Sequence, residues 1–277
     1  MKALIFGEVL IDEYPDGRVV AGAPLHVAVH LVDLGWEAFL ISRVGRDNDA
    51  EWIFETLSAH GVPDDLVEVD DDLPTGTASV EMSVAGPEFV LHSPVAWDAI
   101  KGPDLIPEHD VLYFGSLAGR DPRSRRTLER MSALSQAPTK LFDVNLRPPH
   151  VNGEVLAHGL AEATVVKVND TEYEEVPQVL DFEPSTRGYF KLGRRLEWLC
   201  VTRGPDGATL YDRAGDAWEV GPATVEVVDT VGAGDAFTAG LLDGIYRGMD
   251  PGDILGAAQD RAASTLAHRG GLPEPPG

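Results

Sequence analysis

The sequence predicts an α/β fold in which helices cover both faces of a mostly parallel sheet and a small β-hairpin is attached to it. Short, continuous apolar runs alternate with helical patterns, which is typical of strands buried on both faces. The alternation breaks at residues 77–92, where two β-rich runs flank Gly86 and Pro87, as expected for a hairpin. Sheets of this kind bind ligands at the carboxyl ends of their strands, and polar clusters follow several of the runs.

The regular elements follow in chain order. Pro24 can open the first helix and Gly35 can end it, because proline suits a first helical turn and glycine suits the position past the last one. Apolar runs predict strands at 3–6, 39–44, 77–84, 88–92, 111–115, 140–144, 164–168 and 199–202, and a late antiparallel pair at 208–211 and 217–220. Apolar spacing predicts helices at 24–34, 49–60, 122–135, 233–247 and 251–268, and one that starts near residue 169.

Length and composition indicate a soluble globular protein. The chain has 277 residues, 43% of them apolar and 25% charged, so we expect a single domain at 1–277 and exclude disordered, collagen-like and coiled-coil structure. The single cysteine, Cys200, cannot form an internal disulfide, and we expect a buried thiol. The short apolar run at the N-terminus predicts no signal peptide, and no run approaches the roughly 20 residues of a membrane span. We therefore expect a cytoplasmic protein.

The charge of the chain is unusual. With 22 basic and 46 acidic residues the formal net charge is −24, and only five of the basic residues are lysines. A surface this negative is repelled by nucleic acids and by anionic lipids, so we expect neither as a partner. Any phosphate group that the protein binds must be met locally, by backbone dipoles or by a metal ion.

The most informative segment runs from Asp229 to Asp235. Small residues at Gly232, Ala233 and Gly234 allow a sharp turn whose N–H groups point outward, at the positive end of the helix that starts there. The segment therefore predicts an anion site built without lysine. Two flanking carboxylates cost energy at such a site unless a cation or a proton transfer requires them.

Other interpretations of this loop are weaker. Asp235 could be an ordinary acid that stabilises the start of a helix. A dinucleotide-binding loop would need a third glycine where Phe237 stands, and it would follow the first strand rather than lie near the end of the chain. A Walker loop is excluded because the Gly-Lys-Ser/Thr sequence is missing.

The string DTVGAGDAFTAG at 229–240 resembles the C-terminal signature of the ribokinase-like (PfkB) carbohydrate kinases, and this match is highly specific. The resemblance covers nearly the whole chain and is to fructokinase-like members. Further segments that are similar to motifs of the family are GEVLID at 7–12, AGAPLHVA at 21–28, DVNLRP at 143–148, NDTE at 169–172 and TRGPDG at 202–207.

The resemblance implies a catalytic role for the glycine loop. Asp235 would be the base that takes a proton from a sugar hydroxyl, and the backbone of Gly232, Ala233 and Gly234 would hold the charge on the transferred γ-phosphoryl group. The residues agree with this, because phosphoryl transfer depends on alignment and charge stabilisation more than on covalent chemistry.

The resemblance also implies where ATP and cations bind. Asn169 and Glu172 would position Mg²⁺ and the phosphates through water, which suits an ion that keeps most of its water ligands. The same pair also fits an ordinary capping box at a helix start. Asp229 would be near a monovalent cation such as K⁺. The remaining positions that the resemblance assigns to ATP are Thr202, Gly204, Gly207 and Thr230.

The resemblance implies a sugar site at Asp12, Gly22, Ala23, His26 and Arg147. Asp12 can accept hydrogen bonds from two hydroxyls, and the Gly22–Ala23 loop can donate from its backbone. His26 stands where the family usually has Asn, and it can still donate a hydrogen bond to a hydroxyl. The alternative interpretation is that His26 has no role in binding and lies on the surface of its helix. Arg147 can contact the sugar or an anionic group on the sugar or ATP, so a sugar acid stays open.

The hairpin at 77–92 corresponds to a β lid that closes over the sugar in the family, and a contribution from 12–20 is open. Two-stranded hairpins are marginal alone, so this one must pack on the domain or pair with a second copy; a homodimer through the lid is one expectation. In the last helix, the family commonly has an Asn that contacts the nucleotide, whereas this chain has Ala258–Arg261. The nucleotide donor is therefore less determined than the reaction.

These observations predict an ATP-dependent kinase that phosphorylates a primary hydroxyl of a small sugar, with fructose as the first candidate. Ribose, 2-keto-3-deoxygluconate and nucleosides stay open within the same fold. A non-catalytic sugar- or nucleotide-binding protein is the alternative from another class, and the intact Asp235 and glycine loop argue against it.

Overall fold

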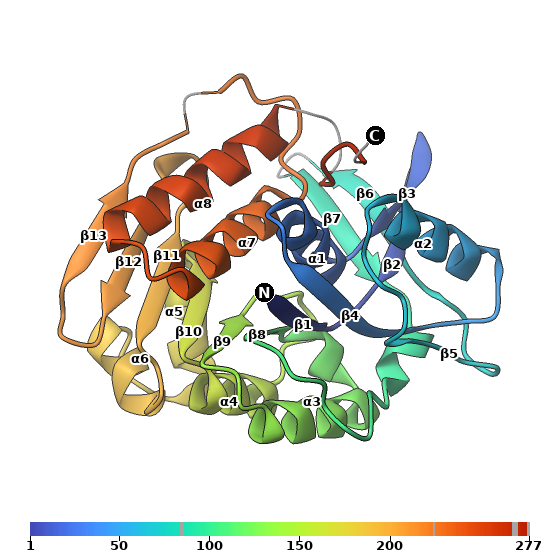
Figure 1. The fold of residues 1–277 in the computed structure, drawn as a ribbon, viewed down its shortest axis with the longest axis horizontal. Helices are drawn as coiled ribbons and strands as arrows, with labels where there is room; N and C mark the ends of the chain where they lie inside the picture. The colour runs from blue at the N-terminus through green and yellow to red at the C-terminus, as the bar shows by residue number, and fades with distance from the viewer. Residues whose placement is uncertain (84–85, 224, 268–270, 276–277) are drawn as a thin grey trace.

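The computed structural model describes residues 1–83, 86–223, 225–267 and 271–275 (Figure 1). In this part of the chain, nine strands form a central sheet, whose six neighbouring pairs from β11 to β5 are parallel, while the last two strands are antiparallel. Their spatial order is β13 (Ala217–Val220), β12 (Ala208–Asp212), β11 (Trp198–Thr202), β10 (Val165–Asn169), β9 (Thr139–Asp143), β8 (Val111–Gly115), β1 (Lys2–Phe6), β4 (Glu37–Val44) and β5 (Val67–Val69).

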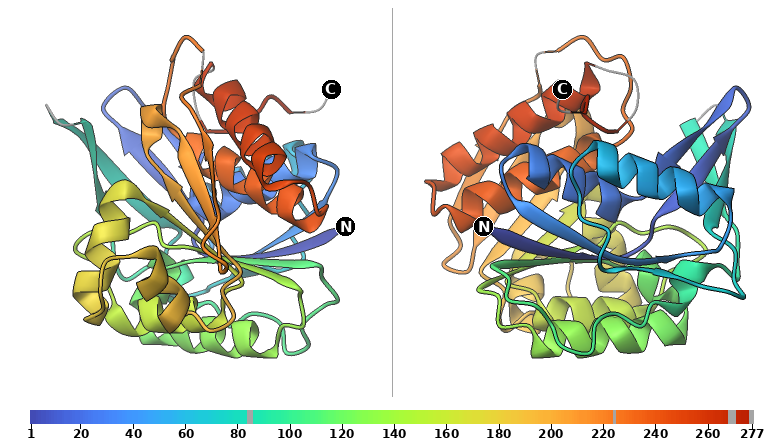
Figure 2. Two further views of the ribbon diagram at one scale, coloured as in Figure 1. Left: turned by 90° about the vertical axis from the view of Figure 1, so that its left-hand side faces the viewer. Right: turned by 45° about the vertical axis from the view of Figure 1, so that its right-hand side comes forward.

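Helices cover both faces of this sheet (Figure 2). One face carries α1 (Ala23–Asp33), α2 (Asn48–Ala59), α7 (Ala233–Tyr246) and α8 (Pro251–Leu266). The other face carries α3 (Pro122–Leu134), α4 (Gly153–Glu162), α5 (Asp170–Leu180) and α6 (Thr186–Leu192). Short 3-10 turns are η1 (Ala96–Ala99), η2 (Leu117–Arg120) and η3 (Gly204–Asp206). No helix of the described residues is long and apolar enough to cross a membrane.

Each helical layer encloses its own apolar core. Successive strand residues point to opposite faces, so Ala3 and Ile5 pack beneath the α7 layer while Leu4 and Phe6 pack beneath the α3 layer. All four side chains are fully buried. This two-sided burial explains the continuous apolar runs of the sequence and confirms the predicted α/β fold with a mostly parallel sheet.

A second, smaller sheet lies at one side of the central sheet (Figure 1). It has four strands, in the order β3 (Gly17–Ala21), β2 (Leu10–Tyr14), β6 (Gly76–Ser83) and β7 (Gly86–Leu91). The β2–β6 pair is parallel and the other two pairs are antiparallel. The predicted hairpin is therefore half of a larger sheet and finds its partner strands within the same chain. The connection between its strands, residues 84–85, lies outside the described residues.

Register determines which residues of the small sheet share a face. Asp12 lies opposite Val19 on β3 and Ala78 on β6. Its neighbour Ile11 lies opposite Thr77, on the other face. The side chain of Asp12 is therefore presented on the Val19 and Ala78 face, and that of Thr77 on the reverse.

Candidate active site

The glycine loop forms the N-terminus of α7. Gly232 precedes the first helical residue with a φ of 74°, a left-handed conformation that glycine adopts without strain. A Cβ at this position would also overlap the backbone of Gly271. The carbonyl of Gly232 accepts from the N–H groups of Asp235 at 3.0 Å and Ala236 at 2.8 Å, so the helix begins directly after the loop. The geometry has the features of an anion site, because the first N–H groups of a helix point outward at its positive end.

Asp235, in the first turn of α7, contacts His26 in the first turn of α1. The distance between Asp235 Oδ2 and His26 Nδ1 is 2.8 Å. Only 16% of the Asp235 side chain and 6% of the His26 side chain are exposed. The start of α1 is also set by a glycine, Gly22, which has a φ of 126° and is followed by Ala23. The starts of two helices therefore meet, and the residues predicted for the base and for the sugar are in direct contact.

Asp12 faces the same region from the small sheet. It is buried, and burial raises the pKa of Asp12 to about 6, against the lowering effect of the nearby His26 and Arg147 side chains. Since His26 and Arg147 both act on the Asp12 carboxyl, these three predicted sugar residues lie near one another. Since the pKa stays below 7, Asp12 is ionised and accepts hydrogen bonds at neutral pH.

The loop that carries Arg147 is held by a hydrogen bond to Glu172 of α5. Asn145 has a φ of 38°, a strained conformation that Asn tolerates better than most residues. Next to it, the N–H of Leu146 donates to Glu172 Oε1 at 2.7 Å. Glu172 therefore anchors the Arg147 loop, a link between two predicted motifs that their spacing in the sequence does not reveal.

The floor of the site contains polar atoms that the sequence analysis did not select. Glu8 Oε2 and Tyr113 Oη are buried and have no hydrogen-bond partner among the described residues. Glu8 follows β1, and Tyr113 lies on the adjacent strand β8. Burial, with a smaller contribution from the charge of Asp235, raises the pKa of Glu8 to about 7, although a backbone hydrogen bond and the charge of Arg147 act in the opposite direction. The signal in the sequence was an acid directly after a buried strand.

Glu8→Gln should stabilise the protein at pH 8 by about 1–3 kcal/mol and have less effect at pH 5. The folded protein keeps the Glu8 proton up to about pH 7, whereas the unfolded chain releases it near 4.5. The stability contributed by Glu8 therefore falls as pH rises through this window, at about 1.4 kcal/mol per pKa unit. Urea unfolding of both proteins at pH 5 and pH 8 measures this, and a difference independent of pH would contradict it.

A buried ion pair lies directly under the glycine loop. Lys167 Nζ on β10 is 3.0 and 3.1 Å from the carboxylate oxygens of Asp143 on β9. Thr238 of α7 donates to Asp143 Oδ2 at 3.2 Å and to the carbonyl of Gly234 at 2.8 Å. Burial opposes the charge of Lys167, but the neighbouring carboxylates of Asp143, Glu172 and Asp235 together outweigh it and raise the pKa of Lys167.

Through Thr238, in the second turn of α7, this ion pair of the sheet is linked to the helix. A Cβ on Gly234 would lie 4.0 Å from Lys167 Nζ, so a positive charge sits just beneath the loop. Lys167 was not among the predicted site residues. The available signal was a lysine inside an otherwise apolar strand, since a charge in such a run must be paired.

The predicted nucleotide residues lie further along the same edge of the sheet. Asn169 caps α5: its Oδ1 accepts from Glu172 N at 2.8 Å, and Glu172 Oε2 accepts from Asn169 N at 2.9 Å. The capping box is therefore formed. Thr202 lies opposite Asn169 in the parallel pair of β10 and β11, and Gly204 and Gly207 follow in the turn after β11. The motifs NDTE and TRGPDG thus lie side by side.

Two other predicted residues lie in the loop before α7. Asp229 Oδ1 accepts from Val231 N at 3.1 Å, and Thr230 is exposed. Both are next to the glycine loop. No cluster of three His, Cys, Asp or Glu side chains able to hold a metal ion occurs within the described ranges.

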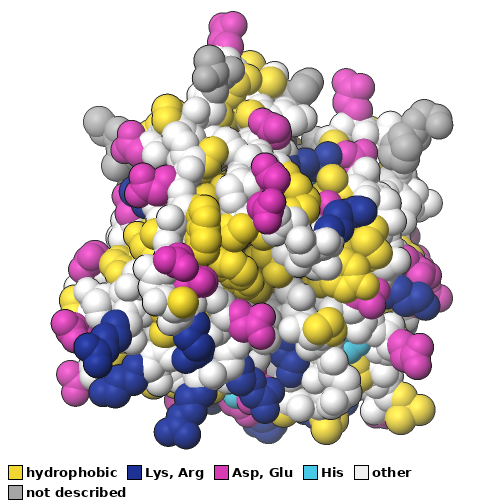
Figure 3. All heavy atoms as spheres, turned by 60° about the vertical axis from the view of Figure 1, so that its left-hand side comes forward, with side chains coloured by type: hydrophobic (Ala, Val, Ile, Leu, Met, Phe, Trp, Pro, Cys, Tyr) yellow, Lys and Arg dark blue, Asp and Glu magenta, His cyan; other side chains and the backbone are white. Residues whose placement is uncertain are grey.

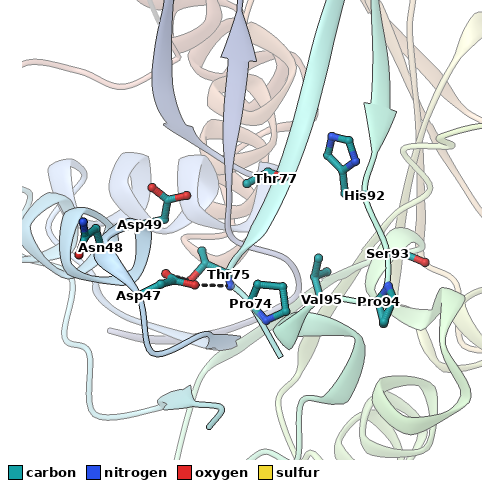
Figure 4. Close-up of a pocket in the computed structure, with 10 residues that line it drawn as sticks. All are labelled: Asp47, Asn48, Asp49, Pro74, Thr75, Thr77, His92, Ser93, Pro94 and Val95. Carbon is teal, nitrogen blue, oxygen red and sulfur yellow. Dashed lines mark hydrogen bonds between the residues drawn. The ribbon is translucent and has the colours of Figure 1, made fainter. Parts of the chain in front are cut away.

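Two cavities border the small sheet. One of about 1110 Å³ reaches His26 and is lined by the β2–β3 turn, by Trp52 of α2, by the loop before α7 and by Leu272. The other, of about 540 Å³, lies at the base of the sheet on the face away from Asp12 (Figure 4). There the carboxylate of Asp47 accepts from Thr75 N at 2.9 Å and from Thr75 Oγ1 at 2.6 Å. Only the first cavity reaches the candidate active site.

The surface charge is unevenly distributed. On the face in Figure 3, Asp and Glu side chains are spread over the upper part, the centre and the margins, most Lys and Arg side chains lie in the lower part with a few at the upper right, and an apolar area lies in the middle. Screening over roughly 8 Å at physiological salt separates most of these charges from the buried site. The electrostatic potential that an anion experiences in the site is therefore set mainly by local groups, such as Lys167 and the start of α7.

Comparison with known proteins identifies the family. A model of the pfkB family carbohydrate kinases matches residues 15–275. The chain belongs to the PfkB family of carbohydrate kinases. It is thus a sugar kinase, a phosphotransferase with an alcohol group as acceptor, and the α/β fold with its small accessory sheet is the fold of this family.

Three PfkB relatives are informative. An uncharacterized sugar kinase of Pyrococcus horikoshii is 31% identical over 88% of this chain and 83% of its own; its structure in complex with ATP superimposes with a TM-score of 0.87 over 99% and 95% of the two chains. A fructokinase of Klebsiella pneumoniae is 28% identical over 94% of this chain and 90% of its own. The aminoimidazole riboside kinase of Salmonella typhimurium is 28% identical over 89% and 81%.

Proposed function

We propose that the protein transfers the γ-phosphoryl group of ATP to a primary hydroxyl of a small ketose, with fructose as the first candidate. The observation that carries this proposal is the contact between Asp235, in the first turn of α7, and His26, which also acts on the Asp12 carboxyl of the small sheet. The fructokinase among the relatives supports the choice of sugar.

In this proposal Asp235 accepts the proton of the attacking hydroxyl as its oxygen bonds to the γ-phosphorus and the bond to ADP breaks. The N–H groups of Gly232 and Gly234, and that of Ala233 on leaving its long 3.4 Å contact with the Thr230 carbonyl, face the charge that spreads over the γ-phosphoryl oxygens. Lys167, beneath the loop, adds a positive charge to the same place. Asp12 and the Gly22–Ala23 backbone orient the sugar, and Arg147 closes one side of the site.

ATP would lie along the edge formed by Thr202, Gly204, Gly207 and Thr230, and Mg²⁺ would neutralise its phosphates. Both oxygens of Glu172 already accept a backbone N–H, from Leu146 and from Asn169. Each oxygen has a second lone pair, so the pair fits Mg²⁺ through water rather than by direct ligation. We extend the proposal to a K⁺ ion near Asp229, which measurement of activity with and without KCl tests. We also propose a homodimer that forms through the small sheet, which light scattering tests.

A riboside is the second candidate acceptor. The cavity beside His26, at about 1110 Å³, is larger than a hexose requires, and Trp52 and Leu272 give it apolar walls. Such a space suits a sugar that carries a base. The aminoimidazole riboside kinase among the relatives phosphorylates a molecule of this kind by its name.

A coupled ADP-release assay tests the function. The panel contains fructose, ribose, 2-keto-3-deoxygluconate, inosine and aminoimidazole riboside, each with and without Mg²⁺. We expect the highest kcat/KM for fructose, with NMR placing the phosphate on a primary carbon. A riboside with higher kcat/KM would favour the second candidate. Ligand binding without ADP release would favour the non-catalytic alternative.

Asp12→Asn should raise the KM for the sugar about 10–100-fold at pH 7.5 and leave the KM for ATP unchanged. An ionised carboxylate accepts hydrogen bonds from hydroxyls more strongly than an amide. Because the pKa of Asp12 is raised to about 6, the wild-type KM should rise as pH falls below 6, and the variant should lose this dependence. Initial rates between pH 5 and 8 measure both. An unchanged sugar KM in the variant would remove Asp12 from the site.

A further inference from the structure

We propose that His26 positions Asp235 through Nδ1 and selects a hydroxyl, through Nε2, as the acceptor group that lies beside the base. The inference rests on the proposed role of Asp235. Its basis is the 2.8 Å contact between His26 Nδ1 and Asp235 Oδ2, which joins two largely buried side chains from different helices.

The contact determines where the proton of a neutral imidazole lies. An ionised carboxylate only accepts hydrogen bonds, so the proton between the two side chains belongs to His26 Nδ1. Nε2 is then an acceptor. It has no hydrogen-bond partner in the part of the chain that the structure describes, and His26 borders the cavity of about 1110 Å³. A hydroxyl that donates to Nε2 fits this position, whereas a carboxylate oxygen would meet a lone pair.

His26 is itself held in place from the far side. A Cβ on Gly271 would lie 2.7 Å from His26 Cε1, so the backbone there packs against the ring. The carbonyl of Gly271 accepts from Nε2 of His30 at 3.1 Å, and Arg261 Nε donates to His30 Nδ1 at 3.1 Å. Burial lowers the pKa of His30 to about 4, so it is neutral at pH 7. A row of contacts from α8 to Gly271 therefore supports the ring.

The carboxylate of Asp235 gains one defined orientation from this arrangement. Oδ2 is engaged by His26, and Oδ1 is left for the hydroxyl that is to be deprotonated. A base that must be within hydrogen-bond distance of its proton depends on such orientation, and small displacements of reacting groups lower rates strongly.

Two isosteric variants separate the two nitrogens. The amide nitrogen of Asn lies near the position of Nδ1, and that of Gln near Nε2. His26→Asn should keep kcat within about threefold and raise the sugar KM about 10-fold. His26→Gln should lower kcat about 10–100-fold, as expected for a misplaced base. Rates are measured with the sugar of the panel that has the highest kcat/KM, and thermal unfolding confirms that both variants are folded.

The control for a buried histidine is His60→Asn, at the end of α2 and outside the site, which should leave kcat and both KM values unchanged.

Asp235→Asn and the double variant Asp235→Asn with His26→Gln complete a double-mutant cycle. In the Asp235→Asn background, His26→Gln should change the residual rate less than twofold, because residues that act as a unit are not additive. A merely structural role would lower both rates equally.

The same variants separate a failure of the role of His26 from a failure of the proposed role of Asp235. Wild-type turnover in Asp235→Asn would refute the base itself and with it this inference. A strong loss in Asp235→Asn together with wild-type kcat in His26→Gln would leave the base intact and overturn the role of His26. A kcat that rises in His26→Gln would also overturn it, because the contact would then restrain the base.

Discussion

Asp235→Asn should lower kcat by about 10²–10⁴-fold at saturating sugar and ATP, the range expected for loss of a general base. The amide cannot take up the hydroxyl proton, while its size and shape match those of the carboxylate. The carboxylate lies 2.8 Å from His26 Nδ1, and an amide can keep this contact through its oxygen. Both KM values and the free energy of unfolding should therefore change little.

The matched control is Asp253→Asn. Asp253 is also an acid in the first turn of a helix, α8, and it is exposed. If Asp235 served only to stabilise its helix end, the two variants would have similar small effects on stability, of about 0.3–1 kcal/mol, and neither would lose turnover. ADP release by both, measured in parallel, separates the capping interpretation from the catalytic one.

Lys167→Met should lower the free energy of unfolding by about 3–5 kcal/mol, because it leaves the carboxylate of Asp143 buried without its partner. Asp143 is 1% exposed, and both of its oxygens lie within 3.1 Å of Lys167 Nζ. We also expect a loss of turnover, because the ammonium group lies beneath Gly234. Urea unfolding at pH 7.5 measures the stability.

The double variant Lys167→Met with Asp143→Asn should recover most of this stability, since no unpaired charge remains and the amide can still accept from Thr238. Lys191→Met, an exposed lysine of α6, is the control and should have an effect within about 0.5 kcal/mol. A single variant no less stable than this control would show that the ion pair does not hold the sheet to α7.

The strands and most helices could be predicted because local pattern determines them. A strand such as Val111–Gly115 is apolar throughout, and this is sufficient to place it in a sheet covered on both faces. β5 was not predicted, since three residues with an exposed end carry no pattern. α4 and α6 were also missed; α4 begins with Gly153, a poor helix former, and packing against the sheet stabilises it.

The small sheet shows where local pattern fails. Its edge strand β3 contains Gly17 and Arg18, which by themselves indicate a turn. It becomes a strand because it pairs with β2. β2 is itself held in the sheet by β6, which pairs with its other edge and lies more than sixty residues further along the chain. Arg18 then forms an ion pair with Asp49 of α2 at 2.7 Å. The hairpin 77–92 was predicted, but its partners could not be read from spacing.

The sequence by itself determined the family, the glycine loop and its aspartate, because small residues before an apolar helix favour an anion site and the string DTVGAGDAFTAG is specific for the family. Only the tertiary structure decided what surrounds them: His26 on Asp235, Lys167 and Asp143 beneath the loop, and a buried Glu8 oxygen, Oε2, that has no hydrogen-bond partner among the described residues. The physical reason is that burial and charge pairing join residues far apart in the chain, such as His26 and Asp235, which are 209 positions apart. Such pairs depend on strand order and helix packing, which no local pattern contains.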